Sequence, residues 1–287
     1  MLKKGKKKFK KVSIGTAQFG SKYGATNKKK IIFNDIKKIF SSAKKDQILN
    51  FDTAQDYGNA ENIIGKFSKR TNFKITTKFN KKNFDLEKSI YNLKNIPECV
   101  MFHTLDDYID KKFRSHIIKF CKIYKIKNVG ISLYYNDLKY LKKVDKSIST
   151  FQIPLNILDQ RFLFNKNFIN FVQKNKIKLE ARSVFLQGFL FKKPSYVFKK
   201  FNVSKHYSTT IMNILKKNKI SLAELSYSWV YNNKMINKVI VGLNSYSHYL
   251  SLKKFKLLNK KDLILIKKSY SHSKNLDQVF GFTGSSI

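Results

Sequence analysis

The sequence predicts an α/β protein with a single-domain (β/α)8 TIM barrel, and three observations point to this fold. Short runs rich in β-branched and aromatic residues alternate with longer segments whose apolar residues recur at helical spacing. Eight such strand–helix units fit within the 287 residues. The competing fold, a doubly wound open sheet, usually opens with a G-x-G-x-x-G loop, and the early glycines, at 15, 20 and 24, lack this spacing.

The first four units follow one another without a break in composition. Their strands are predicted at KVSIG (11–15), ILNFD (48–52), FKITTKF (73–79) and ECVMFHT (98–104). Apolar residues at helical spacing among lysines predict the helices that follow, over 33–45, from Asn59 onward, over 83–94 and over 106–125. Asn59 is a suitable helix N-cap, and the helix after it carries Ile63, Ile64 and Phe67 on one side.

The last four units repeat the pattern. Their strands are predicted at NVGISL (128–133), TFQIPLN (150–156), KLEARSVF (178–185) and KVIVGL (238–243). Helices are predicted over 137–144, 167–175, 208–217, 221–232, 246–255 and 260–269. Residues 192–207 are the least regular stretch and are expected to form a mobile surface loop. We expect residues 1–10 to form a frayed basic arm and residues 11–287 to form the barrel.

The charge of the chain is extreme but spread along its whole length. It has 59 basic and 18 acidic residues, a formal net charge of +41. Such a charge suggests a polyanion-binding protein, which stays open as the least favoured function. Only four basic residues are arginines, whose bidentate fork suits phosphates and bases. The interpretation we favour is a compositional bias toward solvated lysines, with no specific nucleic-acid partner.

Other compositional features narrow the class of protein. The two cysteines, Cys99 and Cys121, have no metal-binding spacing, so we expect no metal site and a reducing, cytoplasmic location. No stretch approaches the ~20 apolar residues of a membrane span. The oligomeric state cannot be predicted from the sequence.

Four polar residues fall at or just after the ends of three successive predicted strands. Asp52 ends the second strand and Tyr57 follows it, while Lys78 and His103 lie near the ends of the third and fourth. In a (β/α)8 barrel the carboxyl ends of the strands form the active face, so all four should share one rim.

Together these residues could form a tuned proton donor. A nearby ammonium, here Lys78, favours ionised tyrosine and is expected to lower the pKa of Tyr57 from its ordinary value of about 10. Asp52 can partner that lysine, and His103 can donate a hydrogen bond to a substrate oxygen. Such a set suits reduction of a carbonyl group, and because no side chain supplies hydride, a nicotinamide cofactor is needed.

The motifs resemble those of the aldo/keto reductase family. They are IGTAQFGSKYG, FDTAQDYGNAENIIG, TTKF and MFHT, followed in family order by GIS, FQIPLN, RSVFLQGFL and VIVGLNS, from about residue 12 to about residue 255. The resemblance implies that Asp52, Tyr57, Lys78 and His103 form the catalytic tetrad. In it Tyr57 is the general acid, Lys78 and Asp52 tune it, and His103 orients the carbonyl.

The resemblance also implies a cofactor site for NADP, with NAD possible. Gly15 and Thr16 would line the nicotinamide, and Ser132 and Gln152 would hold its carboxamide. The matches around the pyrophosphate are Ser183, Phe185 and Gln187. The adenosine end would lie at Gly242, Asn244, Ser245 and His248.

Several positions depart from the family pattern. Leu133 replaces a usual Asn or Asp beside Ser132, and Arg182 replaces an aromatic residue that stacks on nicotinamide. Gly242 and His248 replace the usual Lys and Arg at the 2′-phosphate, which weakens the preference for NADP.

Residues on the neighbouring loops could shape the substrate pocket. Arg161 could bind an anionic substrate group or simply pair with Asp159. Four aromatic residues could wall the pocket or pack in the core: Tyr23, Phe79, Tyr134 and Tyr135.

The predicted function is therefore NAD(P)H-dependent reduction of an aldehyde or ketone, with a sugar or sugar derivative as the first substrate candidate. A catalytically weak, cofactor-binding barrel that acts as a sensor or partner subunit is the alternative.

Overall fold

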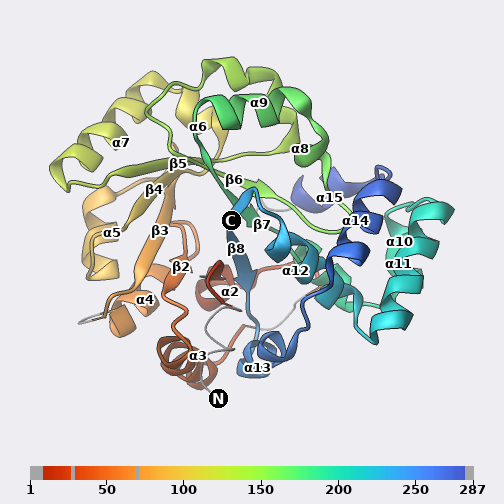
Figure 1. The fold of residues 1–287 in the computed structure, drawn as a ribbon. Helices are drawn as coiled ribbons and strands as arrows, with labels where there is room; N and C mark the ends of the chain where they lie inside the picture. Colours follow the sequence, from red (N-terminus) through yellow and green to blue (C-terminus); the bar gives the residue numbers. More distant parts are fainter. Residues whose placement is uncertain (1–8, 27–29, 69–70, 282–287) are drawn as a thin grey trace.

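The structure, a computed structural model, describes residues 9–26, 30–68 and 71–281, and its eight parallel strands close into a barrel (Figure 1). Each strand pairs with the next in sequence, and the last pairs with the first. The strands are β1 (Val12–Gly15), β2 (Asn50–Asp52), β3 (Lys74–Phe79), β4 (Cys99–Phe102), β5 (Asn128–Ser132), β6 (Thr150–Pro154), β7 (Lys178–Arg182) and β8 (Ile236–Gly242). The predicted (β/α)8 barrel is confirmed.

Helices surround the barrel and supply its outer core (Figure 1). They include α3 (Phe33–Lys45), α4 (Ala60–Ser68), α5 (Leu86–Leu93), α9 (Lys166–Lys174), α11 (Lys205–Asn218), α12 (Leu222–Asn232), α13 (Tyr246–Lys254) and α14 (Lys260–Ser269). The packing of α3 is typical. Its apolar face buries Ile36, Ile39 and Phe40, and the Phe40 ring stacks on Phe51 of β2 with centroids 4.7 Å apart.

The helix predicted over 106–125 is divided in two. It consists of α6 (Leu105–Ile109) and α7 (Lys111–Ile123), separated at Asp110. Asp110 adopts an extended conformation, and its carboxylate accepts a hydrogen bond from the Phe113 backbone N–H at 2.9 Å. An aspartate that caps a new helix cannot also continue the preceding one, so the single-helix prediction is wrong here. The helix predicted over 137–144 is present as the 3-10 helix η1 (Tyr135–Lys143).

The segment after β7 is more ordered than predicted. Residues 192–207 contain α10 (Pro194–Lys200), with proline in its first turn, and Ser204 caps α11. The mobile-loop prediction is therefore wrong. The strand predicted over 178–185 ends at Arg182 because Ser183 has a φ of +57°. The short helices α2 (Ala17–Gly20), α8 (Arg161–Phe164) and α15 (Leu276–Gly281) were not predicted.

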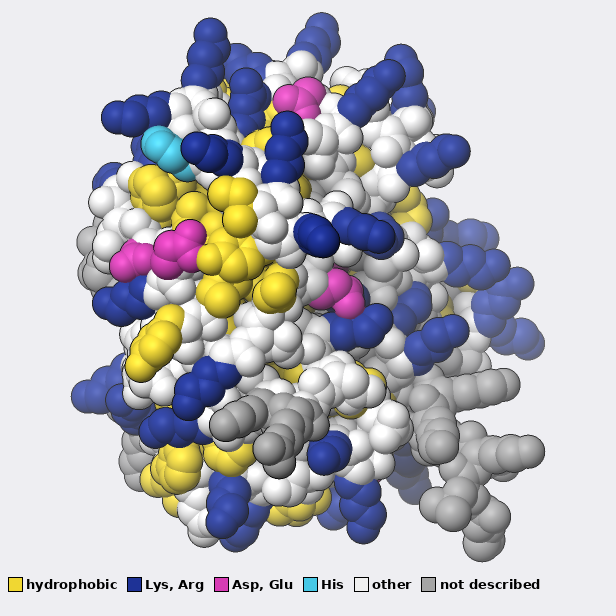
Figure 2. Space-filling view, turned by 90° about the vertical axis from the view of Figure 1, so that its left-hand side faces the viewer, with side chains coloured by type: hydrophobic (Ala, Val, Ile, Leu, Met, Phe, Trp, Pro, Cys, Tyr) yellow, Lys and Arg dark blue, Asp and Glu magenta, His cyan; other side chains and the backbone are white. Residues whose placement is uncertain are grey.

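Lysine and arginine side chains are scattered over the face drawn in Figure 2, around a small apolar cluster. The predicted basic arm falls mostly outside the described residues, but Phe9 is buried and packs with the core. Within the described ranges, no helix combines the length and apolar character needed to cross a membrane.

Candidate active site

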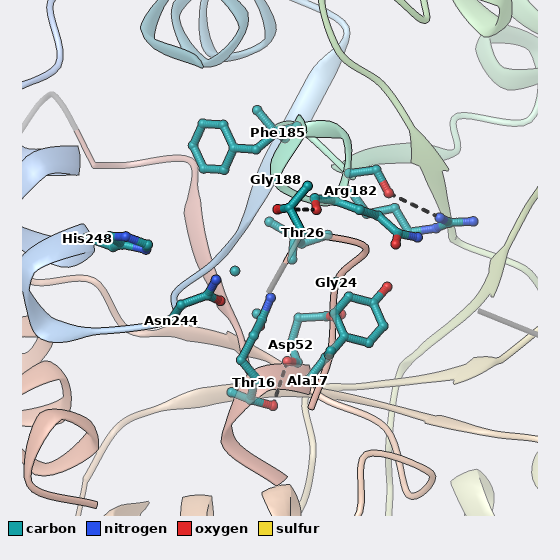
Figure 3. A pocket seen from close by; sticks show the side chains of 18 of the residues that line it. Thr16, Ala17, Gly24, Thr26, Asp52, Arg182, Phe185, Gly188, Asn244 and His248 are labelled. Atoms are coloured by element: carbon teal, nitrogen blue, oxygen red, sulfur yellow. Dashed lines mark hydrogen bonds between the residues drawn. The ribbon is translucent and has the colours of Figure 1, made fainter. Parts of the chain in front are cut away.

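A cavity of about 510 Å³ opens at the carboxyl ends of the strands, where the loops after β1, β2, β7 and β8 meet (Figure 3). The predicted site residues in its wall are Gly15, Thr16, Asp52, Tyr57, Gln152, Arg182, Ser183, Phe185, Gln187, Gly242, Asn244, Ser245 and His248. Lys78, His103 and Ser132 are not in the wall, but each contacts a residue that is.

Asp52 and Lys78 form a buried ion pair inside the rim. The Lys78 Nζ donates to the two carboxylate oxygens of Asp52 at 2.7 and 2.8 Å, and to the Thr53 carbonyl at 2.9 Å. Their side chains are only 1% and 5% exposed. Buried charges need such partners, and the parallel pairing of β2 with β3 brings these two together.

Tyr57 lies where two loops touch without room for side chains. The Tyr57 carbonyl packs against Gly20, where an added Cβ would lie only 1.7 Å from that oxygen. The next residue, Gly58, has a φ of +55°, and a Cβ there would meet the Gly20 carbonyl at 2.8 Å. Both glycines are therefore required for the position of Tyr57. In the sequence, Gly20 was notable only for its spacing from Gly15 and Gly24, so this role was not predicted.

The Tyr57 ring lies beside two other members of the predicted tetrad, Lys78 and His103. Its centroid lies 5.4 Å from the Lys78 Nζ and 5.9 Å from the His103 ring centroid. The predicted lowering of its pKa is wrong for this structure. Burial, and then the charge of Asp52, raise the pKa of Tyr57 well above its ordinary value, while Arg182 opposes them. Lys78 is paired with Asp52, as the sequence predicted, but burial and the charge of Asp52 have the larger influence on the Tyr57 pKa.

His103 is oriented by Asp56, an acid that was not among the predicted site residues. The His103 Nδ1 lies 3.3 Å from the Asp56 carboxylate, which also accepts a hydrogen bond from Asn80. Burial alone would raise the pKa of Asp56, but the hydrogen bonds from His103 and Asn80 lower it overall. Asp56 is the residue before Tyr57, so its place in the motif was the signal that could have identified it.

Gln152 faces into the barrel. Its Nε2 donates to Asp52 at 2.8 Å and lies 3.4 Å from Glu180 of β7. Glu180 in turn lies 3.3 Å from the Lys238 Nζ. Burial raises the pKa of Glu180 despite this lysine. The amide predicted to hold a carboxamide is therefore bound to the Asp52–Lys78 pair.

Arg182, at the end of β7, extends toward the end of β5. Its Nε donates to the Ser132 hydroxyl at 3.2 Å, and its Nη2 to the Leu133 carbonyl at 3.2 Å. The guanidinium carbon lies 4.6 Å from the Tyr134 ring centroid. Ser132, the other predicted carboxamide ligand, is thus engaged by Arg182.

The loop after β7 is strained and crosses the cavity to meet the loop after β1. Ser183, Leu186 and Gln187 all have positive φ, at +57°, +47° and +51°. The Gln187 side chain accepts from the Ala25 N–H at 3.2 Å, and its backbone carbonyl accepts from the Thr26 hydroxyl at 3.2 Å. These contacts join the two loops to each other. Gln187 was predicted as a pyrophosphate ligand, and it also has this structural role.

The loop after β8 forms the opposite end of the cavity. The Ser245 hydroxyl caps α13 by accepting from the His248 N–H at 3.2 Å. The His248 ring stacks on Phe191 with centroids 5.9 Å apart, and desolvation lowers its pKa. Lys192 also lines the cavity and was not predicted.

The remaining candidates divide between the cavity and the core. Tyr23 lines the cavity, whereas Phe79 is fully buried in the core. Arg161 pairs with Asp159 at 2.9 Å and with Asp277 at 2.8 Å, so the pairing interpretation is the one observed. No cluster of three or more potential metal ligands occurs in the described ranges.

Comparisons with known proteins identify the family of the chain and agree with its fold. The model of the aldo/keto reductase family matches residues 11–270. An aldo-keto reductase from Klebsiella pneumoniae in complex with NADPH superposes with a TM-score of 0.66 at 16% identity, over 91% of each chain. The holo form of an aldo-keto reductase from Bacillus halodurans gives 0.67 at 16% identity, over 92% of this chain and 93% of that one. A thermostable aldo-keto reductase with the inhibitor epalrestat gives 0.66 at 18%, over 90% and 94%. No curated protein matched the sequence.

Proposed function

Because the chain belongs to the aldo/keto reductase family, we propose that it uses NADPH to reduce the carbonyl group of an aldehyde or ketone to an alcohol, with Tyr57 as the proton donor. The observation that carries this proposal is the position of Tyr57 in the cavity wall, beside the buried Lys78–Asp52 pair and the His103 ring. A sugar or sugar derivative stays the substrate class suggested by the sequence alone.

The roles of the four side chains follow from their contacts. A raised pKa keeps Tyr57 protonated, so it has a proton to give as negative charge grows on the substrate oxygen. Lys78, 5.4 Å from the ring, stabilises the phenolate that this leaves. His103, whose ring centroid lies 5.9 Å from that of Tyr57 and whose Nδ1 faces Asp56, orients the substrate oxygen.

The cavity suits a dinucleotide that carries phosphates. Its wall holds the cation Lys192, whereas Asp52, the one acid among the described residues of that wall, is already paired with Lys78. Ser183, Gln187 and the N-terminus of α13 add polar groups that suit phosphate oxygens. When bound, the nicotinamide supplies the hydride. Lys192 provides a cation for the 2′-phosphate where the family's usual Lys and Arg are absent, which favours NADP over NAD.

The nicotinamide end favours a second candidate function, a cofactor-binding barrel with weak catalysis that acts as a sensor or partner subunit. Leu133 offers no polar side chain, Gln152 is bound to Asp52, and Ser132 already accepts from Arg182. The Ser132 hydroxyl keeps its own proton to donate, so the carboxamide retains one partner.

Fluorescence titration with NADPH and NADH, followed by assays on a panel of aldehydes, distinguishes the two candidates. We expect NADPH binding below millimolar concentration, turnover by the wild type, and a loss of kcat of about 100-fold or more in Tyr57→Phe. Tyr91→Phe is the matched control, because Tyr91 is 80% exposed on α5. Binding without turnover supports the sensor. Equal turnover by Tyr57→Phe removes Tyr57 as the acid, and failure to bind either cofactor refutes the reductase.

A further inference from the structure

We propose that Arg182 forms an anion subsite and that the preferred substrates are carbonyl compounds bearing a carboxylate; this rests on the proposed reductase function. Arg182 lines the same cavity as Tyr57 and Tyr23. In Figure 3 its guanidinium lies at the end of the cavity away from His248. The charge therefore lies at the reacting end and not where the adenosine phosphate is expected.

The guanidinium is held in one plane and still has hydrogen-bond donors to offer. Its three acceptors among the described residues are the Ser132 hydroxyl, the Leu133 carbonyl and, at 3.4 Å, the Ser183 hydroxyl. The Tyr134 ring supports its face, with the guanidinium carbon 4.6 Å from the ring centroid. A guanidinium has five N–H groups, so two remain for a ligand.

The charge of Arg182 has no carboxylate partner in the described ranges, although the side chain is half-buried. Arg161, by contrast, pairs with two carboxylates. Burial raises the pKa of Asp137, and the charge of Arg182 opposes that rise. Asp137 nevertheless forms no ion pair with Arg182, and its carboxylate accepts from the Tyr134 N–H at 2.7 Å.

A planar carboxylate offers the two oxygens that two guanidinium N–H groups recognise. The field of Arg182 also reaches the reacting end. It opposes the rise in the pKa of both Tyr57 and Tyr23 caused by burial. A carboxylate bound there would place the rest of a small carbonyl compound beside Tyr57.

The test compares acids with their neutral esters at saturating NADPH. One pair is 4-carboxybenzaldehyde and methyl 4-formylbenzoate, and a shorter pair is glyoxylate and ethyl glyoxylate. We expect kcat/KM to favour the acid by about tenfold or more in at least one pair, as for a charge-assisted hydrogen bond. In Arg182→Gln this acid-to-ester ratio should fall by about tenfold. Arg114→Gln is the control, because Arg114 lies outside the cavity and faces Asp145, and it should keep the wild-type ratio.

A ratio near one for both pairs in the wild type, or a ratio that Arg182→Gln leaves unchanged, overturns the anion subsite. If no aldehyde is reduced, the proposed reductase function fails, and calorimetry still tests the subsite. Binding of 4-carboxybenzaldehyde but not its ester, lost in Arg182→Gln, would support the subsite. Equal binding of the two, or binding of neither, would overturn it.

Discussion

Replacing Lys78 by methionine should reveal how strongly the buried ion pair constrains the protein. The change keeps most of the side-chain volume but removes the Nζ that donates to Asp52 at 2.7 and 2.8 Å. The Asp52 side chain is 5% exposed. Of its two side-chain donors, Lys78 and Gln152, it would keep only Gln152, at 2.8 Å. Breaking a buried pair on one side typically costs about 3–5 kcal/mol of the free energy of unfolding.

Proton uptake sets an upper bound on that loss. Protonating an ordinary aspartate at pH 7 costs about 4 kcal/mol, so a variant that neutralises Asp52 in this way loses about that much. The loss should shrink as the pH falls, because proton uptake becomes cheaper by about 1.4 kcal/mol per pH unit. The double variant Asp52→Asn/Lys78→Met removes both charges and should recover about 2 kcal/mol or more of the single-variant loss.

Urea unfolding followed by circular dichroism measures these free energies. The matched control is Lys81→Met, because Lys81 pairs with Asp106 at the same 2.7 Å but on the surface. The free energy of unfolding of Lys81→Met should equal that of the wild type within the error of the measurement. A loss below about 1 kcal/mol for Lys78→Met at pH 7, or no recovery in the double variant, would refute the argument that the buried pair constrains the fold.

Three further predictions concern the cavity. Gly20→Ala should lower kcat by about tenfold or more without abolishing folding, because its Cβ would displace the Tyr57 carbonyl; full activity would contradict the packing argument. Lys192→Met should weaken NADPH binding by about fivefold relative to NADH, measured by fluorescence titration, and an equal effect on both would separate Lys192 from the 2′-phosphate. The raised pKa of Tyr57 means that its ionisation begins above pH 10, where it costs stability. The difference in absorbance at 295 nm between wild type and Tyr57→Phe should therefore show no phenolate at pH 10, where an ordinary tyrosine is half ionised.

The sequence was sufficient for the barrel and for the neighbourhood of the tetrad. Eight alternations of period-2 and helical patterns define the order of the elements, and parallel strands must direct their carboxyl ends to one rim. Asp52, Tyr57, Lys78 and His103 accordingly lie together. The break at Asp110 and the early end of β7 at Ser183 depend on single backbone conformations, which apolar periodicity does not encode.

The pKa values and hydrogen-bond partners of the site residues could not be predicted from the sequence, because they depend on which groups contact one another in the folded protein. The sequence placed Lys78 near Tyr57, but it did not indicate that two bonds to Asp52 would leave burial as the main influence on the Tyr57 pKa. Gln152 and Arg182 likewise have side chains long enough to reach several acceptors. Only the packed structure decides among them.

The pairing of β1 with β8 has a consequence for biosynthesis. Gly15 lies opposite Gly242, so one wall of the cavity joins the first strand of the barrel in sequence order to the last. Until Ile236–Gly242 has emerged, β1 and β7 are open strand edges that can associate with other chains. Contacts so distant in sequence also slow folding. A chain that ends before β8 would therefore lack the adenosine end of the cavity and would also depend on chaperones to avoid aggregation.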